Sequence, residues 1–160
     1  MTCICHGYEL YKWKKHTFET QTVSFTCGPI AILNALRFHK RPTGPAVHRQ
    51  IMVGCHPKII HEDGFKGTKP DDLERMLWPS VQRFTGAEAC QKALASNTAC
   101  ILLYQRTPRL QHYIFVHRDA SGYHLENESD EGSVRVTDML PYLTSNKSVP
   151  IVWTCPSPNP

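Results

Sequence analysis

The stretch QTVSFTCGPIAILNAL, residues 21–36, decides how the rest of the chain is interpreted. In it, Cys27 stands where a Thr/Ser-rich segment meets an apolar run long enough for a buried helix. Thr26 is a candidate N-cap and Pro29 fits a first helical turn, so we expect a helix over residues 28–39. A thiol at a helix start lies near the positive end of the helix dipole, which favours the nucleophilic thiolate. A small buried residue at the start of a core helix is the other interpretation, and the remaining sequence has to decide between them.

The composition is that of one ordinary globular domain. The chain has 160 residues, of which 41% are hydrophobic and 20% charged, and its formal net charge is +4. No repeat or linker divides it, so we expect a single domain over residues 1–160, with residues 1–7 and 155–160 as loose termini. Charges of both signs are interspersed, and no block predicts binding to nucleic acid or to a membrane surface.

The cysteines and the apolar runs indicate the compartment. No apolar run reaches the roughly 18 to 20 residues that span a bilayer, and the N-terminal residues lack the pattern of a signal peptide. The seven cysteines are an odd number without regular spacing. This usage predicts free thiols in a reducing compartment, the cytoplasm, or the host cytoplasm for an effector or viral protein. Metal-ligand spacing is also missing, so we expect no metal. Chemistry by a cysteine thiol requires no organic cofactor, and we expect none.

Helix signals come first in the chain and strand signals follow. Expected helices cover residues 28–39, 46–53, 68–77, 86–95 and 138–143, the third with Thr68 as its cap; expected strands cover residues 8–16, 98–104, 112–117, 123–127, 132–137 and 149–154, with a polar loop at 106–111 and a turn at 119–122. We therefore predict an α+β fold in which a central buried helix packs on a C-terminal antiparallel sheet.

A cysteine nucleophile needs a base and a group that holds the base in one tautomer. Among nine histidines, His112 opens a predicted strand after a polar loop, which would place it at a sheet edge facing a cleft. Asn127 ends the next strand of the hairpin, and strand parity turns its side chain inward, so its amide is the predicted orienter. Gln21, six residues before Cys27, is a candidate oxyanion donor together with the Cys27 N–H.

Three acidic residues compete with Asn127 for the orienting role. They are Glu126, Glu128 and Asp130, all at the end of the same predicted strand. Parity places the two glutamates on the opposite face, but a bulge of one residue would reverse that assignment.

This order of motifs resembles the papain-like cysteine peptidase superfamily. The resemblance rests on Gln21-x5-Cys27-Gly28-Pro29-Ile30-Ala31, on His112-Tyr113-Ile114-Phe115-Val116, and on the strand ending in Asn127. The chain is most similar to the compact single-domain group that includes bacteriocin-leader peptidases, and residues 67–73 also look like that group. Many relatives carry Asp-Pro where this chain has Asn127-Glu128, but papain-type enzymes use Asn. The resemblance implies a papain-like fold with Cys27 as nucleophile, His112 as base, Asn127 as orienter and Gln21 as oxyanion donor.

The activity that the resemblance implies is hydrolysis of peptide or isopeptide bonds, including those to ubiquitin-like modifiers. The partner would be a protein or peptide substrate, attacked by Cys27 to form a thioester. Three alternatives stay open: a glutamine deamidase effector or toxin with the same triad, a viral leader protease that processes its own C-terminus, and a non-catalytic binding module on this fold.

Overall fold

The fold is described from a computed structural model. It describes residues 2–5, 8–12, 18, 25–58, 61–62, 67–108, 110–129, 132–147 and 149–159, of which residues 2–5 and 8–12 are described by their backbone alone. Gln21 and Asp130 lie outside the described residues, so the proposed roles of these two side chains remain predictions.

Mixed helices and antiparallel strands confirm the predicted α+β class. The helices are α1 (Cys27–Phe38), α2 (Pro45–Cys55), α3 (Pro70–Arg75), α4 (Ala87–Ser96), α5 (Leu140–Leu143) and the 3-10 turn η1 (Ser145–Lys147). The strands are β1 (Thr2–Cys5), β2 (Tyr8–Lys12), β3 (Gln82–Thr85), β4 (Ala99–Thr107), β5 (Leu110–Asp119), β6 (Gly122–Ser129), β7 (Gly132–Val136) and β8 (Ile151–Thr154). β1 pairs with β2, and the other strands form one antiparallel sheet in the order β3-β8-β4-β5-β6-β7.

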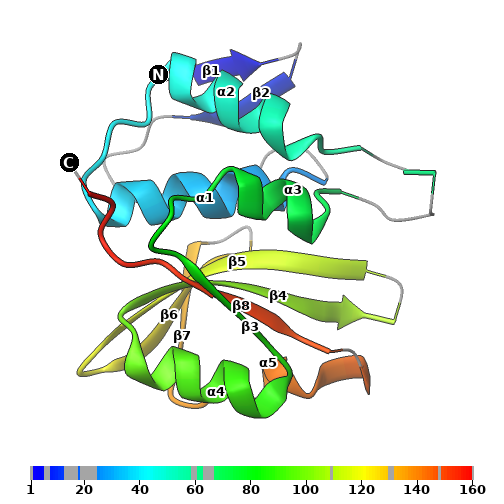
Figure 1. Cartoon of the computed structure of the whole chain (residues 1–160), viewed down its shortest axis with the longest axis vertical. Coiled ribbons are helices and arrows are strands. Elements are labelled where there is room, and N and C mark those ends of the chain that lie inside the picture. Colours follow the sequence, from blue (N-terminus) through cyan, green and yellow to red (C-terminus); the bar gives the residue numbers. More distant parts are fainter. Residues whose placement is uncertain are drawn as a thin grey trace.

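The six-stranded sheet separates two hydrophobic clusters. Successive side chains of a strand point to opposite faces, so Tyr113 and Phe115 of β5 join the cluster around α1, whereas Ile114 and Val116 join the cluster around α4. Figure 1 shows α1, α2, α3 and the β1–β2 hairpin on one side of the sheet, and α4 and α5 on the other. Almost every residue of α1 is buried, as predicted for the central helix.

The β4–β5 hairpin differs from the prediction. Residues 106–111 were expected to form a polar loop that His112 follows, but β4 continues to Thr107 and β5 begins at Leu110. His112 is therefore the third residue of β5, paired with Tyr104. The polar ends of these strands are exposed, and main-chain pairing extends the hairpin without any hydrophobic alternation to reveal it in the sequence.

Two further elements depart from the sequence-based expectation. β3 was not predicted, because a short edge strand with mostly exposed side chains has no apolar alternation. The helix expected from Thr68 begins one residue later than its predicted cap: Lys69 is the N-cap of α3, followed by Pro70. Thr68 is instead buried, and its carbonyl accepts a hydrogen bond from the Tyr113 hydroxyl at 2.7 Å.

The segment 155–159 was expected to be loose and is packed instead. Cys155 is buried, and its N–H donates to the Ala99 carbonyl at 2.8 Å. Side chains bind the carbonyl oxygens that follow: His39 Nε2 lies 2.7 Å from the Cys155 oxygen, Trp78 Nε1 lies 2.9 Å from the Pro156 oxygen, and Arg41 binds the Pro158 oxygen. Pro156 and Pro158 have no N–H with which to pair to a neighbouring strand, and side-chain donors to the carbonyls hold the segment instead. At the other terminus, residues 2–5, also expected to be loose, form β1.

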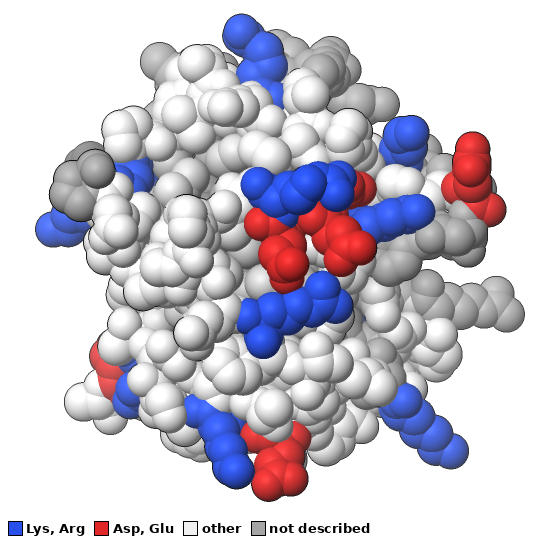
Figure 2. Space-filling model, viewed as in Figure 1, with Lys and Arg blue, Asp and Glu red and all other residues white. Residues whose placement is uncertain are grey.

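Surface charges on one face are paired rather than of one sign. Figure 2 shows Lys/Arg and Asp/Glu gathered together over α3 and β3. Arg83 lies 3.4 Å from Asp71 and 3.6 Å from Glu74, and Arg75 pairs with Asp72. Among the described residues no helix is both long and apolar enough to cross a membrane.

Candidate active site

Cys27 is the first residue of α1, at the end of the helix that is buried against the sheet. The chain enters the helix through Phe25, which has a left-handed φ of 68°. Gly28 follows the cysteine because no side chain fits there: a Cβ would lie 2.7 Å from Thr68 Oγ1 and 2.8 Å from Thr68 Cβ. The segment 67–69 thus packs directly on the first turn of α1 and fixes where the thiol is held.

The thiol is nearly buried, with 7% of Cys27 exposed. Burial raises the pKa of the Cys27 thiol; backbone N–H groups of Tyr113, Gly28 and Cys27 itself lower it, as does the Arg106 charge, but they offset burial only in part. The sequence suggested that the helix start would favour the thiolate. The N–H groups do act in that direction, but desolvation is the larger effect and the resting group is the neutral thiol.

The edge of β5 explains the contact between the thiol and Tyr113. The hairpin turn at residues 120–121 pairs Asp119 with Gly122, so the odd-numbered residues of β5 direct their N–H groups toward β6. β6 pairs with β5 only from Phe115 onward. The Tyr113 N–H therefore lies beyond the last β5–β6 pair, where it donates a hydrogen bond to the Cys27 sulfur.

His112 is the residue before Tyr113. Its side chain is buried beside Tyr104, on the face of β5 that points away from α1. Its Nε2 lies 2.7 Å from the carbonyl oxygen of Asn127. Because a carbonyl only accepts, Nε2 carries the proton of the neutral ring and Nδ1 is left as the basic nitrogen. Burial lowers the pKa of His112 to about 4, an effect that the Asn127 hydrogen bond opposes and the Arg106 charge reinforces. The resting imidazole is neutral.

Asn127 meets His112 through its main chain, whereas the sequence suggested its side-chain amide. The register of β6 against β7 shifts between Leu125 and Ser129, and Asn127 has a left-handed φ of 69° within this shift. Asn tolerates that conformation better than most residues do. The turn directs the Asn127 carbonyl, and not the predicted side-chain amide, to the imidazole.

The same bulge buries three successive residues, which simple alternation would not do. Leu125, Glu126 and Asn127 are 0%, 3% and 4% exposed. Glu126 accepts from His117 Nε2 at 2.7 Å and from the Ser133 hydroxyl, and Glu128 accepts from the Tyr104 hydroxyl. Neither carboxylate binds the His112 ring in these contacts.

The Tyr113 N–H contacts the Cys27 thiol and the His112 ring contacts the Asn127 carbonyl, so both side chains meet main-chain groups where the β5–β6 pairing ends. Among the described residues no hydrogen bond links the Cys27 thiol to the His112 ring, whose one ring contact of this kind is to Asn127. In Figure 1 the N-terminal end of α1 and the turn of the β4–β5 hairpin lie on the same side of the molecule. Catalytic hydrogen bonds are often long before substrate binds, so a catalytic pair would form only when the Cys27 and His112 side chains move together.

Three neighbours of the site were not identified from the sequence. Tyr104 pairs with His112 across the β4–β5 hairpin, and the predicted strand bounds 98–104 and 112–117 already place these two residues opposite each other. Tyr113 contributes the N–H that faces the thiol. Arg106, an exposed residue at the irregularity of β4, donates to the Glu128 carbonyl at 2.7 Å. No pattern in the sequence distinguishes Arg106 from other exposed arginines.

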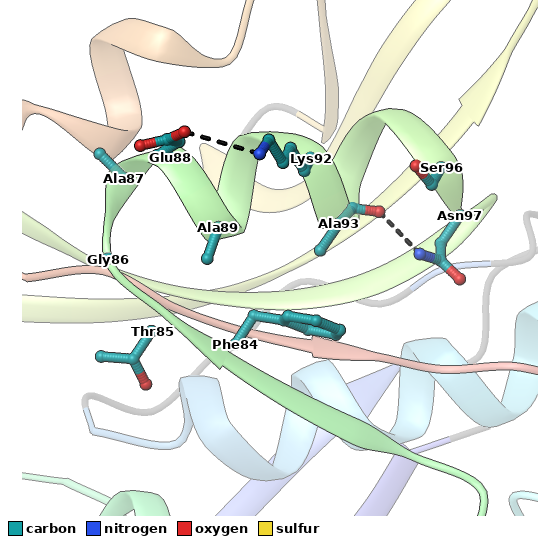
Figure 3. A pocket seen from close by; sticks show the side chains of 10 residues that line it. All are labelled: Phe84, Thr85, Gly86, Ala87, Glu88, Ala89, Lys92, Ala93, Ser96 and Asn97. Carbon is teal, nitrogen blue, oxygen red and sulfur yellow. Dashed lines mark hydrogen bonds and ion pairs between the residues drawn. The ribbon is translucent and has the colours of Figure 1, made fainter.

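A separate hollow of about 640 Å³ lies between β3 and α4, on the sheet face away from α1. Figure 3 shows that Phe84 and the alanines of α4 line it, with the Glu88–Lys92 ion pair along the helix. No cysteine or histidine is among its lining residues, so it is separate from the Cys27–His112 region. Within the described part of the chain, no cluster of three or more His, Cys, Asp or Glu is arranged to hold a metal ion.

A scan against protein-family models finds no match for this chain, and a search of curated proteins finds none either. The functional assignment therefore depends on the residues and contacts described above.

Proposed function

We propose that this protein is a papain-like cysteine peptidase that hydrolyses peptide or isopeptide bonds through a thioester on Cys27. The observation that carries the proposal is the state of His112: its Nε2 is bound to the Asn127 carbonyl, which leaves Nδ1 as the base. This base lies one residue from the N–H that contacts a cysteine at a helix start.

The neutral thiol and neutral imidazole set the order of events. His112 Nδ1 takes the Cys27 proton as Sγ forms a bond to the substrate carbonyl carbon. The negative charge on the carbonyl oxygen is stabilised by the N–H groups at the start of α1, with Gln21 as the predicted second donor. The imidazolium then protonates the departing amine, which leaves a thioester. Water hydrolyses it, with His112 accepting the proton of the water and returning one to the thiol.

Placement of the 155–159 segment argues against cleavage of this segment by the same molecule. His39, Arg41 and Trp78 hold its carbonyls near the C-terminal end of α1, whereas Cys27 begins that helix. Figure 1 shows the C-terminus beside the end of α1 that is remote from Cys27. An intramolecular cut would first need the segment to leave all these contacts.

The proposal includes a reducing compartment, since Cys27, Cys55, Cys90, Cys100 and Cys155 are all free. Burial raises the pKa of Cys55, Cys90, Cys100 and Cys155 as well, so these four thiols resist ionisation.

The test is digestion of a diverse peptide mixture, read by mass spectrometry. We expect new peptide ends with the unmodified protein and with Cys90→Ala, which removes a buried thiol from the other face of the sheet. We expect none with Cys27→Ala or His112→Gln. Mass gains of one unit at glutamine without new ends would instead identify a deamidase, and equal activity of Cys27→Ala would refute the nucleophile.

A further inference from the structure

We infer that Arg106 anchors a carboxylate of the substrate beside the bond that Cys27 attacks. This inference rests on the proposed function and adds the class of substrate: peptides with an acidic side chain next to the scissile bond, or with a free C-terminal carboxylate there.

The position of Arg106 follows from two adjacent carbonyl groups of β6. His112 Nε2 binds the carbonyl of Asn127, and an Arg106 terminal nitrogen donates to the carbonyl of Glu128 at 2.7 Å. Successive carbonyls of one strand therefore hold the imidazole and the guanidinium. A substrate that is close enough to exchange a proton with His112 is within side-chain reach of Arg106.

The charge of Arg106 is available to a ligand. Within the described part of the chain, no carboxylate forms an ion pair with it, and the nearby Glu128 carboxylate accepts the Tyr104 hydroxyl instead. A guanidinium has five N–H donors, stays charged at all working pH values and matches a carboxylate in bidentate geometry. The side chain is exposed, so most of these donors are open to solvent and to substrate.

Electrostatics supports the same placement independently of any hydrogen bond. The Arg106 charge lowers the pKa of Cys27, of His112 and of Glu128. One cation that acts on Cys27, His112 and Glu128 lies near all three groups. It would attract an anionic substrate and would also stabilise negative charge on the sulfur.

A purely structural role for Arg106, holding the irregular end of β4, is the alternative to exclude. Such a role would alter stability but not the preference between charged and neutral reactants. Arg135 offers a matched control, because it is another exposed arginine whose guanidinium donates to one main-chain carbonyl, that of Ser121, at 2.7 Å.

The first experiment needs no catalysis. Alkylation of Cys27 by anionic iodoacetate and by neutral iodoacetamide is measured by peptide mass spectrometry, and the ratio of the two rates is taken so that accessibility and ionisation of the thiol cancel. We expect Arg106→Gln to lower the ratio roughly fivefold, which is the size expected for one partly screened charge. Arg106→Lys should restore most of it and Arg135→Gln should leave it unchanged. An equal ratio in the unmodified protein and Arg106→Gln would overturn the inference.

The second experiment uses peptide pairs built on a sequence that the protein cleaves. One pair differs by Glu against Gln beside the scissile bond with an amidated C-terminus; the other pair differs by a free or amidated C-terminus directly after the bond. We expect at least one acidic member to be preferred roughly fivefold or more in kcat/KM, and the preference to disappear in Arg106→Gln. The pair that responds identifies the source of the carboxylate. Preferences that persist in Arg106→Gln, or are absent from both pairs, contradict the inference. If the protein cleaves no peptide, the proposed function fails while the alkylation ratio still decides the place of Arg106.

Discussion

At the scale of single residues, desolvation is the dominant influence on the Cys27–His112 pair. It raises the pKa of the thiol and lowers that of the imidazole to about 4, and both shifts disfavour the thiolate–imidazolium pair. The N–H groups around the sulfur are too few to reverse this in the free protein. We infer that the thiol proton passes to His112 only as the sulfur attacks an electrophile, either a substrate carbonyl or an alkylating agent.

This resting state predicts the acidic limb of the pH–rate profile. Protonated His112 cannot accept the thiol proton, so kcat/KM should be low below pH 4 and rise through about pH 4. An unburied histidine would place this rise near pH 6.5. Because the pKa of the Cys27 thiol is raised, the thiol stays neutral between pH 5 and 8, and we expect no fall in kcat/KM over that range. Measured profiles that rise near 6.5 would show that His112 is solvated or is not the base.

Any side chain at position 28 should clash with Thr68, and shortening Thr68 should relieve the clash. Gly28→Ala would bring a Cβ to 2.7 Å from the buried Thr68 side chain, and we expect a loss of about 1 to 3 kcal/mol in the free energy of unfolding. Urea denaturation should show that Thr68→Ala in the same chain recovers part of the loss. Gly44→Ala is the control, because nothing lies within 4 Å of that Cβ; similar losses for Gly28→Ala and Gly44→Ala would show that the contact is unimportant.

At the scale of elements, the bulge in β6 decides how His112 is held. It gives Asn127 its left-handed φ and turns the carbonyl, not the amide, to the ring. Asn127→Gly should therefore keep kcat/KM within about threefold, since glycine adopts this conformation freely. Asn127→Val should lower kcat/KM at least tenfold, because a β-branched residue resists a positive φ. A hundredfold loss in Asn127→Gly would assign the orienting role to the side-chain amide.

Elements with a strong pattern of apolar or capping residues could be predicted from the sequence, whereas elements defined by the pairing of strands could not. The all-round apolar run after Cys27 specified α1, and Pro70 with Asp71 and Asp72 specified the start of α3 within a residue. β3 and the polar ends of the β4–β5 hairpin carry no alternation, because exposed edge positions place little demand on side chains. The bulge at Asn127 depends on the pairing of β6 with two neighbours, which local sequence does not encode.

The candidate site shows the same division. Cys27, His112 and Asn127 were predicted as site residues because each ends or begins a patterned segment. Arg106 was missed because its place depends on the irregular end of β4 and on the Glu128 carbonyl.

At the scale of the whole molecule, the 155–159 segment at the C-terminal end of the chain packs against elements from its first half. It follows β8 and binds side chains from the end of α1 and from the loop after α3. Truncation after Thr154 would remove buried Cys155 and its main-chain and side-chain hydrogen bonds, and should lower the free energy of unfolding by about 2 to 4 kcal/mol. Truncation after Ser157 keeps all but the Arg41 contact and should cost less than about 1 kcal/mol. Equal thermal midpoints for the full chain and both truncations would contradict a packed segment.

The central claim is that His112 is the base for Cys27, and the rate of Cys27 alkylation tests it without a known substrate. The rate constant for iodoacetamide at pH 7.5 is measured site by site by mass spectrometry in the unmodified protein and in His112→Gln. We predict that Cys27 reacts at least ten times more slowly in His112→Gln, while the rate at Cys90 stays the same. Equal rates at Cys27 in the two proteins would show that the imidazole does not take the thiol proton and would contradict the account.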